Sequence, residues 1–230
     1  MFGGRKITKK YSLNTKGKDY VVGDIHGEFK QLEKKLELIG FNENTDRLYS
    51  LGDLTDRGQH SKDVFEWMNK KWFYPIRGNH EELLISVNKS IFTEAAVIYY
   101  RNGGEWYFDL TKKEQKKVAK YYKSLPTAIT IETNFGPVGL IHADCPVETW
   151  SFLNKLLNSS QSVDIERKCI WSRQRLHIQD QIISDVRAII IGHMKQDVMT
   201  QHGNFYLIDT GSGYENGYLT ILDLETLKAV

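Results

Sequence analysis

The chain has 230 residues, of which 40% are hydrophobic and 12% aromatic, enough apolar material for one large domain or two small ones. Its 31 basic and 29 acidic residues give a formal net charge of +2, so overall charge does not favour nucleic acid or an anionic membrane as a partner. Two cysteines, Cys145 and Cys169, do not make a disulfide scaffold, and no apolar run approaches the ~18 residues of a membrane span. The first twenty residues lack the apolar region of a secretory signal. We expect a soluble, cytoplasmic protein.

Short apolar runs alternate with amphipathic segments in the first 80 residues. Three buried strands are expected, each ending close to a glycine: Tyr20–Val22, Arg47–Leu51 and Trp72–Ile76. Apolar residues recur at helical spacing across 28–39, which predicts a helix there. Ser61 is the expected N-cap of a second helix that ends near Asn69. This alternation predicts an α/β architecture in which helices cover the sheet surfaces.

The rest of the chain is expected to be helical first and then mixed. Residues 81–123 are expected to be mostly helical, and the basic segment 111–123 is interpreted as a solvated helix face rather than a binding patch. Further strands and one long helix are expected as follows: strands at 127–133 and 137–141 joined by a turn, a helix at 149–170, and strands at 187–191, 205–208 and 217–223. No linker or repeat interrupts the chain, so a single domain over 1–230 is expected.

Five of the apolar runs are followed by side chains that bind metals. These side chains are Asp24 and His26, then Asp53 with Asp56 and Arg57, then Asn79 and His80, then His142 and Asp144, and finally His193. One such residue alone is typical of a turn, a cap or a structural histidine. Ligands bind outside the carboxyl ends of strands in α/β sheets, so five such ends would converge on one rim. The repetition predicts a polar site.

The residue types indicate the chemistry of that site. Asp, His and Asn ligands together suit Mn²⁺, Fe or Zn²⁺ better than Ca²⁺. Six ligands are too many for one catalytic ion with open positions, but they suit two ions ~3.5–4 Å apart that share a carboxylate. Arg57, Arg77 and Arg173 could pair with phosphate oxygens, although a salt bridge is a serious alternative for Arg77. The set implies metal-assisted attack of water on a phosphate ester.

The motifs GDIHG (23–27), GDLTDRG (52–58) and GNHE (78–81), followed by a strand-end histidine and a GH pair, are similar to a known family. They resemble the phosphoprotein phosphatase branch of the metallophosphoesterases, in particular its compact bacteriophage and bacterial members. The resemblance extends from about Lys18 onward and is poor over 150–170. It implies a four-layer αββα sandwich of two mixed β-sheets, and a single metallophosphoesterase domain.

The resemblance also implies a role for each motif residue. Two divalent ions, most commonly Mn²⁺, would be held by six ligands: Asp24 and His26 on the first, Asp53 bridging, and Asn79, His142 and His193 on the second. His80 would protonate the leaving oxygen, with Asp56 orienting it. Arg57 and Arg173 would hold phosphate oxygens, with Asn79 beside them. Met194 stands where threonine is usual, which puts in doubt a supporting hydrogen bond to His193.

Three functions remain open at this point. The first is hydrolysis of phosphoserine and phosphothreonine in proteins by direct attack of metal-bound water, with phosphotyrosine a further substrate class. The second is hydrolysis of diadenosine tetraphosphate or another nucleotide, because symmetrical diadenosine tetraphosphatases share the GDIHG start. The third is a non-catalytic phosphate-binding module, which the complete ligand set disfavours. Arg77 and Glu81 are expected to support the site from behind.

Overall fold

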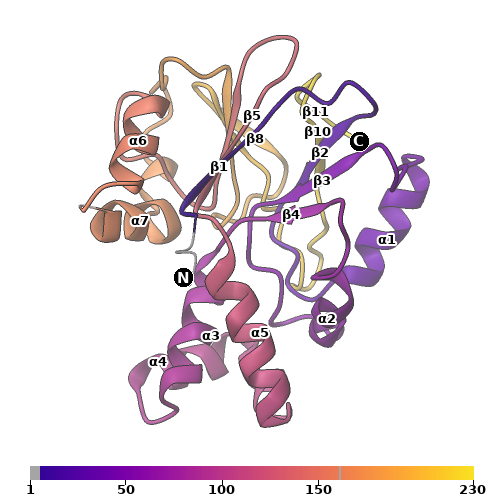
Figure 1. Ribbon diagram of the computed structural model, residues 1–230, viewed down its shortest axis with the longest axis vertical. Helices are drawn as coiled ribbons and strands as arrows, with labels where there is room; N and C mark the ends of the chain where they lie inside the picture. The colour runs from indigo at the N-terminus through magenta and orange to yellow at the C-terminus, as the bar shows by residue number, and fades with distance from the viewer. Residues whose placement is uncertain (1–5, 161) are drawn as a thin grey trace.

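The computed structural model describes residues 6–160 and 162–230, and its centre is a pair of β-sheets packed face to face (Figure 1). The larger sheet has the strand order β1 (Thr8–Tyr11), β5 (Ala128–Ile131), β6 (Val138–Ile141), β7 (Ala188–Ile191), β9 (Phe205–Leu207) and β8 (Thr200–His202). The smaller sheet has the order β11 (Lys228–Ala229), β10 (Ile221–Asp223), β2 (Asp19–Val22), β3 (Arg47–Ser50) and β4 (Phe73–Pro75). Both contain parallel and antiparallel pairs, so both are mixed, as expected.

Successive residues of the central strands face different apolar layers. In β2, Tyr20 and Val22 face the outer helices, while Val21 belongs to the cluster between the two sheets. In β7, Ile189 and Ile191 face the helices on the other side, and Ile190 belongs to the central cluster. Side chains alternate across a strand, so a continuous apolar run such as AIII is buried on both faces. Three apolar layers therefore separate four layers of structure, which is the predicted sandwich.

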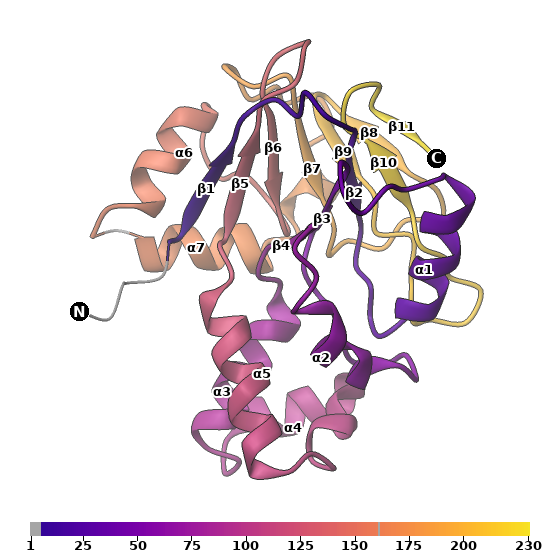
Figure 2. The same cartoon turned by 45° about the vertical axis from the view of Figure 1, so that its right-hand side comes forward.

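Helices cover both outer faces and also form an arm that projects beyond the sheets (Figure 2). On the smaller sheet lie α1 (Phe29–Leu38), the 3₁₀ turn η1 (Ser61–Asp63) and α2 (Val64–Trp67). On the larger sheet lie α6 (Trp150–Leu157) and α7 (Ser162–Trp171), followed by η4 (Gln174–Leu176). The arm consists of α3 (Asn79–Lys89), α4 (Glu94–Tyr99), η2 (Tyr100–Gly104), η3 (Glu105–Tyr107) and α5 (Lys112–Ser124).

Several predicted boundaries were wrong. Ser61 does not cap a helix; its hydroxyl accepts the Asp56 backbone N–H at 2.9 Å and so holds a loop of the candidate site. The predicted helix at 149–170 is two helices, and Thr149 caps the first by accepting the Phe152 N–H. The strand predicted at 217–223 begins only at Ile221, because residues before it bridge back to Gly211. Strands β1, β8 and β11 were not predicted.

Both cysteines are free and buried. Within the described residues, no helix is long and apolar enough to cross a membrane.

Candidate metal centre

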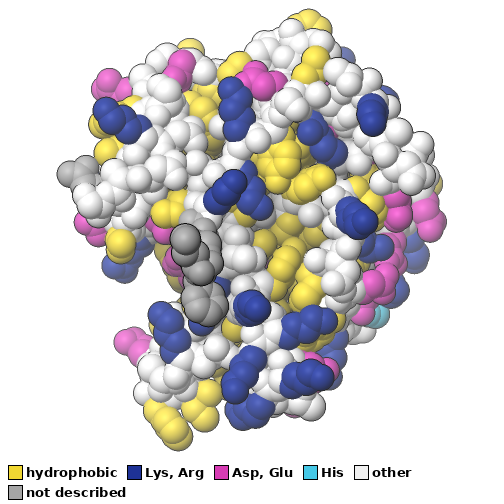
Figure 3. Space-filling view, viewed as in Figure 1, with side chains coloured by type: hydrophobic (Ala, Val, Ile, Leu, Met, Phe, Trp, Pro, Cys, Tyr) yellow, Lys and Arg dark blue, Asp and Glu magenta, His cyan; other side chains and the backbone are white. Residues whose placement is uncertain are grey.

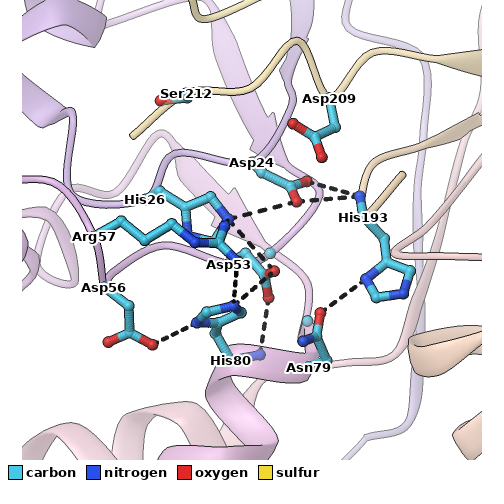
Figure 4. Close-up of polar contacts among 12 residues, drawn as sticks. Asp24, His26, Asp53, Asp56, Arg57, Asn79, His80, His193, Asp209 and Ser212 are labelled. Carbon is cyan, nitrogen blue, oxygen red and sulfur yellow. Dashed lines mark hydrogen bonds and ion pairs between the residues drawn. The ribbon is translucent and has the colours of Figure 1, made fainter. Parts of the chain in front are cut away.

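The six predicted ligands lie at the carboxyl ends of neighbouring strands in both sheets. Five of them are labelled in Figure 4, where they gather around Asp53, and contacts with Asn79 and Asp53 place His142 in the same group. Asp24 and His26 follow β2, Asp53 follows β3, Asn79 begins α3 after β4, His142 follows β6 and His193 follows β7. All six are buried, with 8% or less of each residue exposed. The two sheets are packed so that these strand ends meet, which brings residues up to 169 positions apart into contact, as in the His193 N–H bond to Asp24.

The loops that carry these side chains adopt unusual backbone geometry. Eight non-glycine residues within the described chain have positive φ, and five of them belong to the predicted site: His26 (45°), Asp53 (48°), Asp56 (77°), Arg57 (69°) and His193 (63°). Each such residue costs on the order of 1–3 kcal/mol and persists only where its surroundings fix it. The clustering at the strand ends is typical of a functional site, because ordinary packing gives no reason for it.

Two glycines allow the close approach of these loops. A Cβ at Gly78 would meet Asp53 Oδ1 and lie 2.9 Å from His142 Cε1, and a Cβ at Gly192 would meet Asp24 Oδ1. The motifs therefore need glycine at these positions for space.

Asp53 lies between two groups of donor atoms. Its Oδ1 is 3.5 Å from His142 Nε2, while its Oδ2 is 3.7 Å from His26 Nε2. On the first side, His26 Nε2 is also 3.9 Å from Asp24 Oδ2. On the second side, Asn79 Oδ1 is 2.9 Å from both His142 Nε2 and His193 Nδ1. One carboxylate oxygen thus faces each group, which is the arrangement that a bridging ligand requires.

Hydrogen bonds behind the ligands fix which ring nitrogen faces the centre. His142 Nδ1 donates to the Leu51 carbonyl at 2.6 Å, and His26 Nδ1 donates to the Thr55 carbonyl at 3.1 Å. A neutral ring that donates from Nδ1 has only a lone pair at Nε2. In this tautomer His142 Nε2 faces Asn79 Oδ1 at 2.9 Å as one acceptor opposite another, and this geometry fits a cation that both atoms bind.

The electrostatics also fit a cation. Burial, Asp209 and Asp53 raise the pKa of Asp24 well above its usual range, because an ionised carboxylate there is desolvated and repelled. Burial and the neighbouring Arg57 hold the pKa of His26 well below its usual value, so the ring is neutral and able to ligate. Asp209 was missed by the sequence reading; it follows β9 in YLIDTG and lies beside Asp24 (Figure 4). A divalent ion would relieve this crowding of carboxylates.

His193 differs from the other two histidines. Burial and the neighbouring His142 lower the pKa of His193 to about 3, so the ring is neutral and its Nδ1 can offer a lone pair to a metal ion. Its Nε2 is buried and makes no hydrogen bond of normal geometry within the described residues, although the Trp171 carbonyl lies close enough to raise the ring's pKa. The side chain that follows, Met194, is buried in an apolar cluster and offers no hydroxyl, in line with the doubt raised by the sequence.

His80 and Asp56 form a buried pair beside the two donor groups. His80 Nδ1 is 2.6 Å from Asp56 Oδ2. The other carboxylate oxygen, Oδ1, accepts from Tyr99 Oη at 2.7 Å and from Trp106 Nε1 at 2.6 Å. Burial lowers the pKa of His80, but the carboxylates of Asp53 and Asp56 outweigh it and raise that pKa above its usual value. Neither Tyr99 nor Trp106 was predicted.

The three arginines have different surroundings. The Arg57 guanidinium contacts His26 Nε2, lies 3.1 Å from His80 Nε2 and stacks 4.5 Å above the Tyr214 ring. Arg173 is exposed at the edge of the centre and is close enough to lower the pKa of His193. Arg77 points away from the centre and bonds the Tyr122 and Lys123 carbonyls. The salt-bridge alternative for Arg77 was therefore the right one, since it also pairs with Glu166 at 3.8 Å.

Glu81 and Asp144 support the site indirectly. Glu81 accepts backbone N–H groups from Gly78 at 2.7 Å and from Asp53 and Leu54 at 2.9 Å, so one buried carboxylate joins the GDL and GNHE loops. Asp144 does not join the donor groups; its Oδ1 accepts from Arg175 Nη2 at 2.7 Å and Nε at 3.0 Å. The supporting role expected for Glu81 is thus visible as three hydrogen bonds.

Comparison with known proteins gives the family of the chain. The profile of the calcineurin-like phosphoesterase family matches residues 20–226. The chain belongs to this family. Among curated relatives of this phosphoesterase, "Serine/threonine-protein phosphatase 2" of Salmonella typhimurium is 34% identical over 84% of this chain and 87% of its own length. A symmetrical bis(5'-nucleosyl)-tetraphosphatase of Coxiella burnetii is 27% identical over 68% of this chain and 50% of its own.

Solved structures share the fold at low identity. A protein serine/threonine phosphatase from Saccharomyces cerevisiae has a TM-score of 0.64 at 18% identity, covering 96% of this chain and 78% of that one. A cold-active protein-tyrosine phosphatase of Shewanella has a TM-score of 0.61 at 15% identity, with the same coverages. The predicted metallophosphoesterase sandwich is therefore confirmed.

Proposed function

We propose that this phosphoesterase hydrolyses phosphoserine and phosphothreonine in proteins, with two divalent ions bound by Asp24, His26, Asp53, Asn79, His142 and His193. The observation that carries the proposal is the position of Asp53, whose two oxygens face separate donor groups beside the His80–Asp56 pair. When bound, two such ions supply a nucleophilic water near neutral pH and offset the negative charge of the phosphate. No side-chain nucleophile is then needed.

His80 is proposed as the proton donor to the leaving oxygen. A serine alkoxide is a poor leaving group and must be protonated as it departs. Nδ1 of His80 is engaged by Asp56, so Nε2 is the atom that would carry the transferred proton, and it lies 3.9 Å from Asp53 Oδ2 on the side of the donor groups. The Arg57 guanidinium, 3.1 Å from Nε2, must turn to the phosphate for Nε2 to hold that proton. Asp56 holds the ring in this orientation and keeps its pKa raised.

Arg57, Arg173 and Asn79 are proposed to hold the phosphate oxygens. Arg57 lies beside His80 and His26, where its planar guanidinium can pair with two phosphate oxygens at once. The exposed Arg173 lies close enough to His193 for its charge to lower the pKa of that ring.

The mixed carboxylate, amide and imidazole donors favour Mn²⁺, with Fe and Zn²⁺ as the alternatives. We place the enzyme in the cytoplasm of a bacterial cell or of a phage-infected host.

The proposal is tested by a substrate and metal panel. Phosphoserine and phosphothreonine peptides, p-nitrophenyl phosphate, diadenosine tetraphosphate and a phosphodiester are each assayed with Mn²⁺, Zn²⁺ and Mg²⁺. We expect the phosphopeptides to be hydrolysed fastest with Mn²⁺. Turnover of no substrate with any ion refutes the proposal.

Nucleotide hydrolysis is the second candidate, because a tetraphosphatase is among the relatives at 27% identity. A clear preference for diadenosine tetraphosphate in the same panel would establish it. A non-catalytic phosphate-binding module is distinguished by His80→Asn: an enzyme loses turnover yet still binds metal and inorganic phosphate, whereas a binding module keeps its function.

A further inference from the structure

A groove of about 640 Å³ opens at the C-terminal end of α7, and two of its lining residues, Trp171 and Arg173, lie near the predicted ligand His193. We call it the α7 groove; its lining includes Asp164, Arg167, Lys168, Trp171, Arg173 and Gln174. Arg173 belongs both to this groove and to the proposed phosphate site. A substrate chain that places its phosphate at the metal centre can therefore continue into the groove.

The α7 groove is basic, and its basic groups are available. Arg167, Lys168 and Arg173 are all exposed, and Asp164 is the one acidic residue in the lining. Within residues 6–160 and 162–230, none of the three basic side chains makes a salt bridge under 4.0 Å. Surface cations without such partners are free to pair with the carboxylates of another molecule.

Apart from Asp164 in the lining itself, two acidic residues close to the groove are already engaged. Glu166 accepts from Thr127 Oγ1 at 2.6 Å and pairs with Arg77 on the far side of α7. Glu82 accepts from Trp171 Nε1 at 2.7 Å. Both carboxylates line a neighbouring hollow together with Arg167, but each already has a partner, so the α7 groove keeps its positive charge.

The wall of the groove is fixed to the metal centre. Arg175 donates to Asp144, two residues after His142, and its guanidinium stacks 3.6 Å above the Phe205 ring. Ser172 Oγ lies 3.4 Å from the other Asp144 oxygen. The turn 171–175 is thereby attached to the same strand end that carries a predicted ligand, so the distance from the centre to the groove is set by the fold.

We propose that the α7 groove binds acidic residues that flank the phosphorylated side chain of a protein substrate, so that acidic phosphopeptides are preferred. This inference rests on the proposed phosphoprotein phosphatase function. Solvent-exposed ion pairs are individually weak, so two of them are expected to change kcat/KM by on the order of tenfold, mainly through KM. The preference should weaken with salt, because exposed charges are screened over ~10 Å at 0.1 M.

The test compares phosphoserine peptides that differ only in their flanks, which are acidic, neutral amide or basic. The Mn²⁺-loaded wild type is compared with the double variant Arg167→Gln/Lys168→Gln. The matched control, Lys113→Gln/Lys120→Gln, removes the same charge from the exposed basic face of α5 on the arm, where lysines gather in Figure 3. Melting temperatures of both variants are measured to show that each is folded.

We expect the wild type to prefer the acidic flank by about tenfold, and the α7 variant to lose that preference while the α5 variant keeps it. Hydrolysis of p-nitrophenyl phosphate, which has no flank, should be unchanged in both. Equal kcat/KM for all flanks in the wild type, or an equal loss in the α5 variant, overturns the inference while leaving the proposed function intact. If no substrate is turned over, the proposed function fails. Binding of the same peptides to His80→Asn protein, measured by fluorescence anisotropy, then tests the groove separately, and equal affinity for all flanks overturns the inference that the groove binds acidic residues.

Discussion

Replacing Asp56 with asparagine is expected to disable proton delivery by His80 while leaving the fold intact. Asp56 is fully buried, and both donors to its Oδ1, Tyr99 Oη and Trp106 Nε1, lie within 2.7 Å. The indole N–H can only donate, so the amide oxygen of an asparagine must take that position. Its NH₂ group then faces His80 Nδ1, which must accept. The ring becomes neutral, with its remaining proton on Nε2, and is a much weaker acid.

The size of this effect follows from the hydrogen bond that is lost. A hydrogen bond to a charged group contributes about 1.5–3 kcal/mol, and each 1.36 kcal/mol is tenfold in rate, so kcat for phosphoserine should fall about tenfold to 160-fold. A nitrophenolate leaves without help from an acid, so kcat for p-nitrophenyl phosphate should change by less than about threefold. Tyr99→Phe is the matched control, since it removes one donor but keeps the carboxylate on His80.

The assay is steady-state kinetics on both substrates at saturating Mn²⁺, with metal content measured in each variant. A difference between the two substrates is the signature of lost acid catalysis, because a distorted site would slow both. Equal losses on phosphoserine and p-nitrophenyl phosphate, with metal content unchanged, would refute the role given to His80 and Asp56.

Four further outcomes are expected. His80 has a raised pKa and acts in its protonated form, so kcat for phosphoserine should decline as pH rises through a value above 6.5, and a pH–rate profile should show the decline at lower pH in Asp56→Asn. Glu81→Gln leaves a buried backbone N–H unsatisfied and should reduce the free energy of unfolding by about 1–3 kcal/mol in urea denaturation. Gly78→Ala should fold, since its φ of −100° suits alanine, but it should lose bound metal in elemental analysis because the new methyl group meets Asp53. Chelation should lower the melting temperature, and restoring an ion at 100 times its Kd should raise the free energy of unfolding by about 2.7 kcal/mol. An unchanged melting temperature would contradict the assigned ligands.

The central strands and the ligand rim could be predicted because their signal is local. Apolar runs such as VGLI and AIII are buried on both faces, and a predicted ligand follows each run within two residues. Strands β1 and β8 have polar sequences, TKKY and TQH, because they are edge strands with half-exposed or exposed side chains. These segments are extended because each pairs with a neighbouring strand, and the spacing of apolar residues in the sequence carries no signal of that pairing.

The support for the proton donor could not be predicted, because it depends on tertiary packing. Tyr99 and Trp106 lie 43 and 50 residues from Asp56, and only the fold of the arm brings them to its carboxylate. The sequence separated Arg57 from Arg77 only in part, by giving a salt bridge as a serious alternative for Arg77; the partners of Arg77, the Tyr122 and Lys123 carbonyls and Glu166, depend on tertiary packing. A single domain over 1–230 stays a prediction.

The left-handed backbone at His26, Asp53, Asp56, Arg57 and His193 has a consequence for how the protein can evolve. Glycine adopts positive φ without penalty, but at Asp53 or Asp56 it would also remove an acceptor, because Asp53 Oδ1 accepts the His80 N–H at 3.0 Å and Asp56 Oδ1 accepts from Tyr99 and Trp106. The backbone strain relieved, on the order of 1–3 kcal/mol, and the cost of leaving buried donors without an acceptor are of similar size. Selection on stability alone is therefore expected to be nearly neutral at these two positions, and the metal and proton chemistry proposed for them is what would keep the aspartates in place.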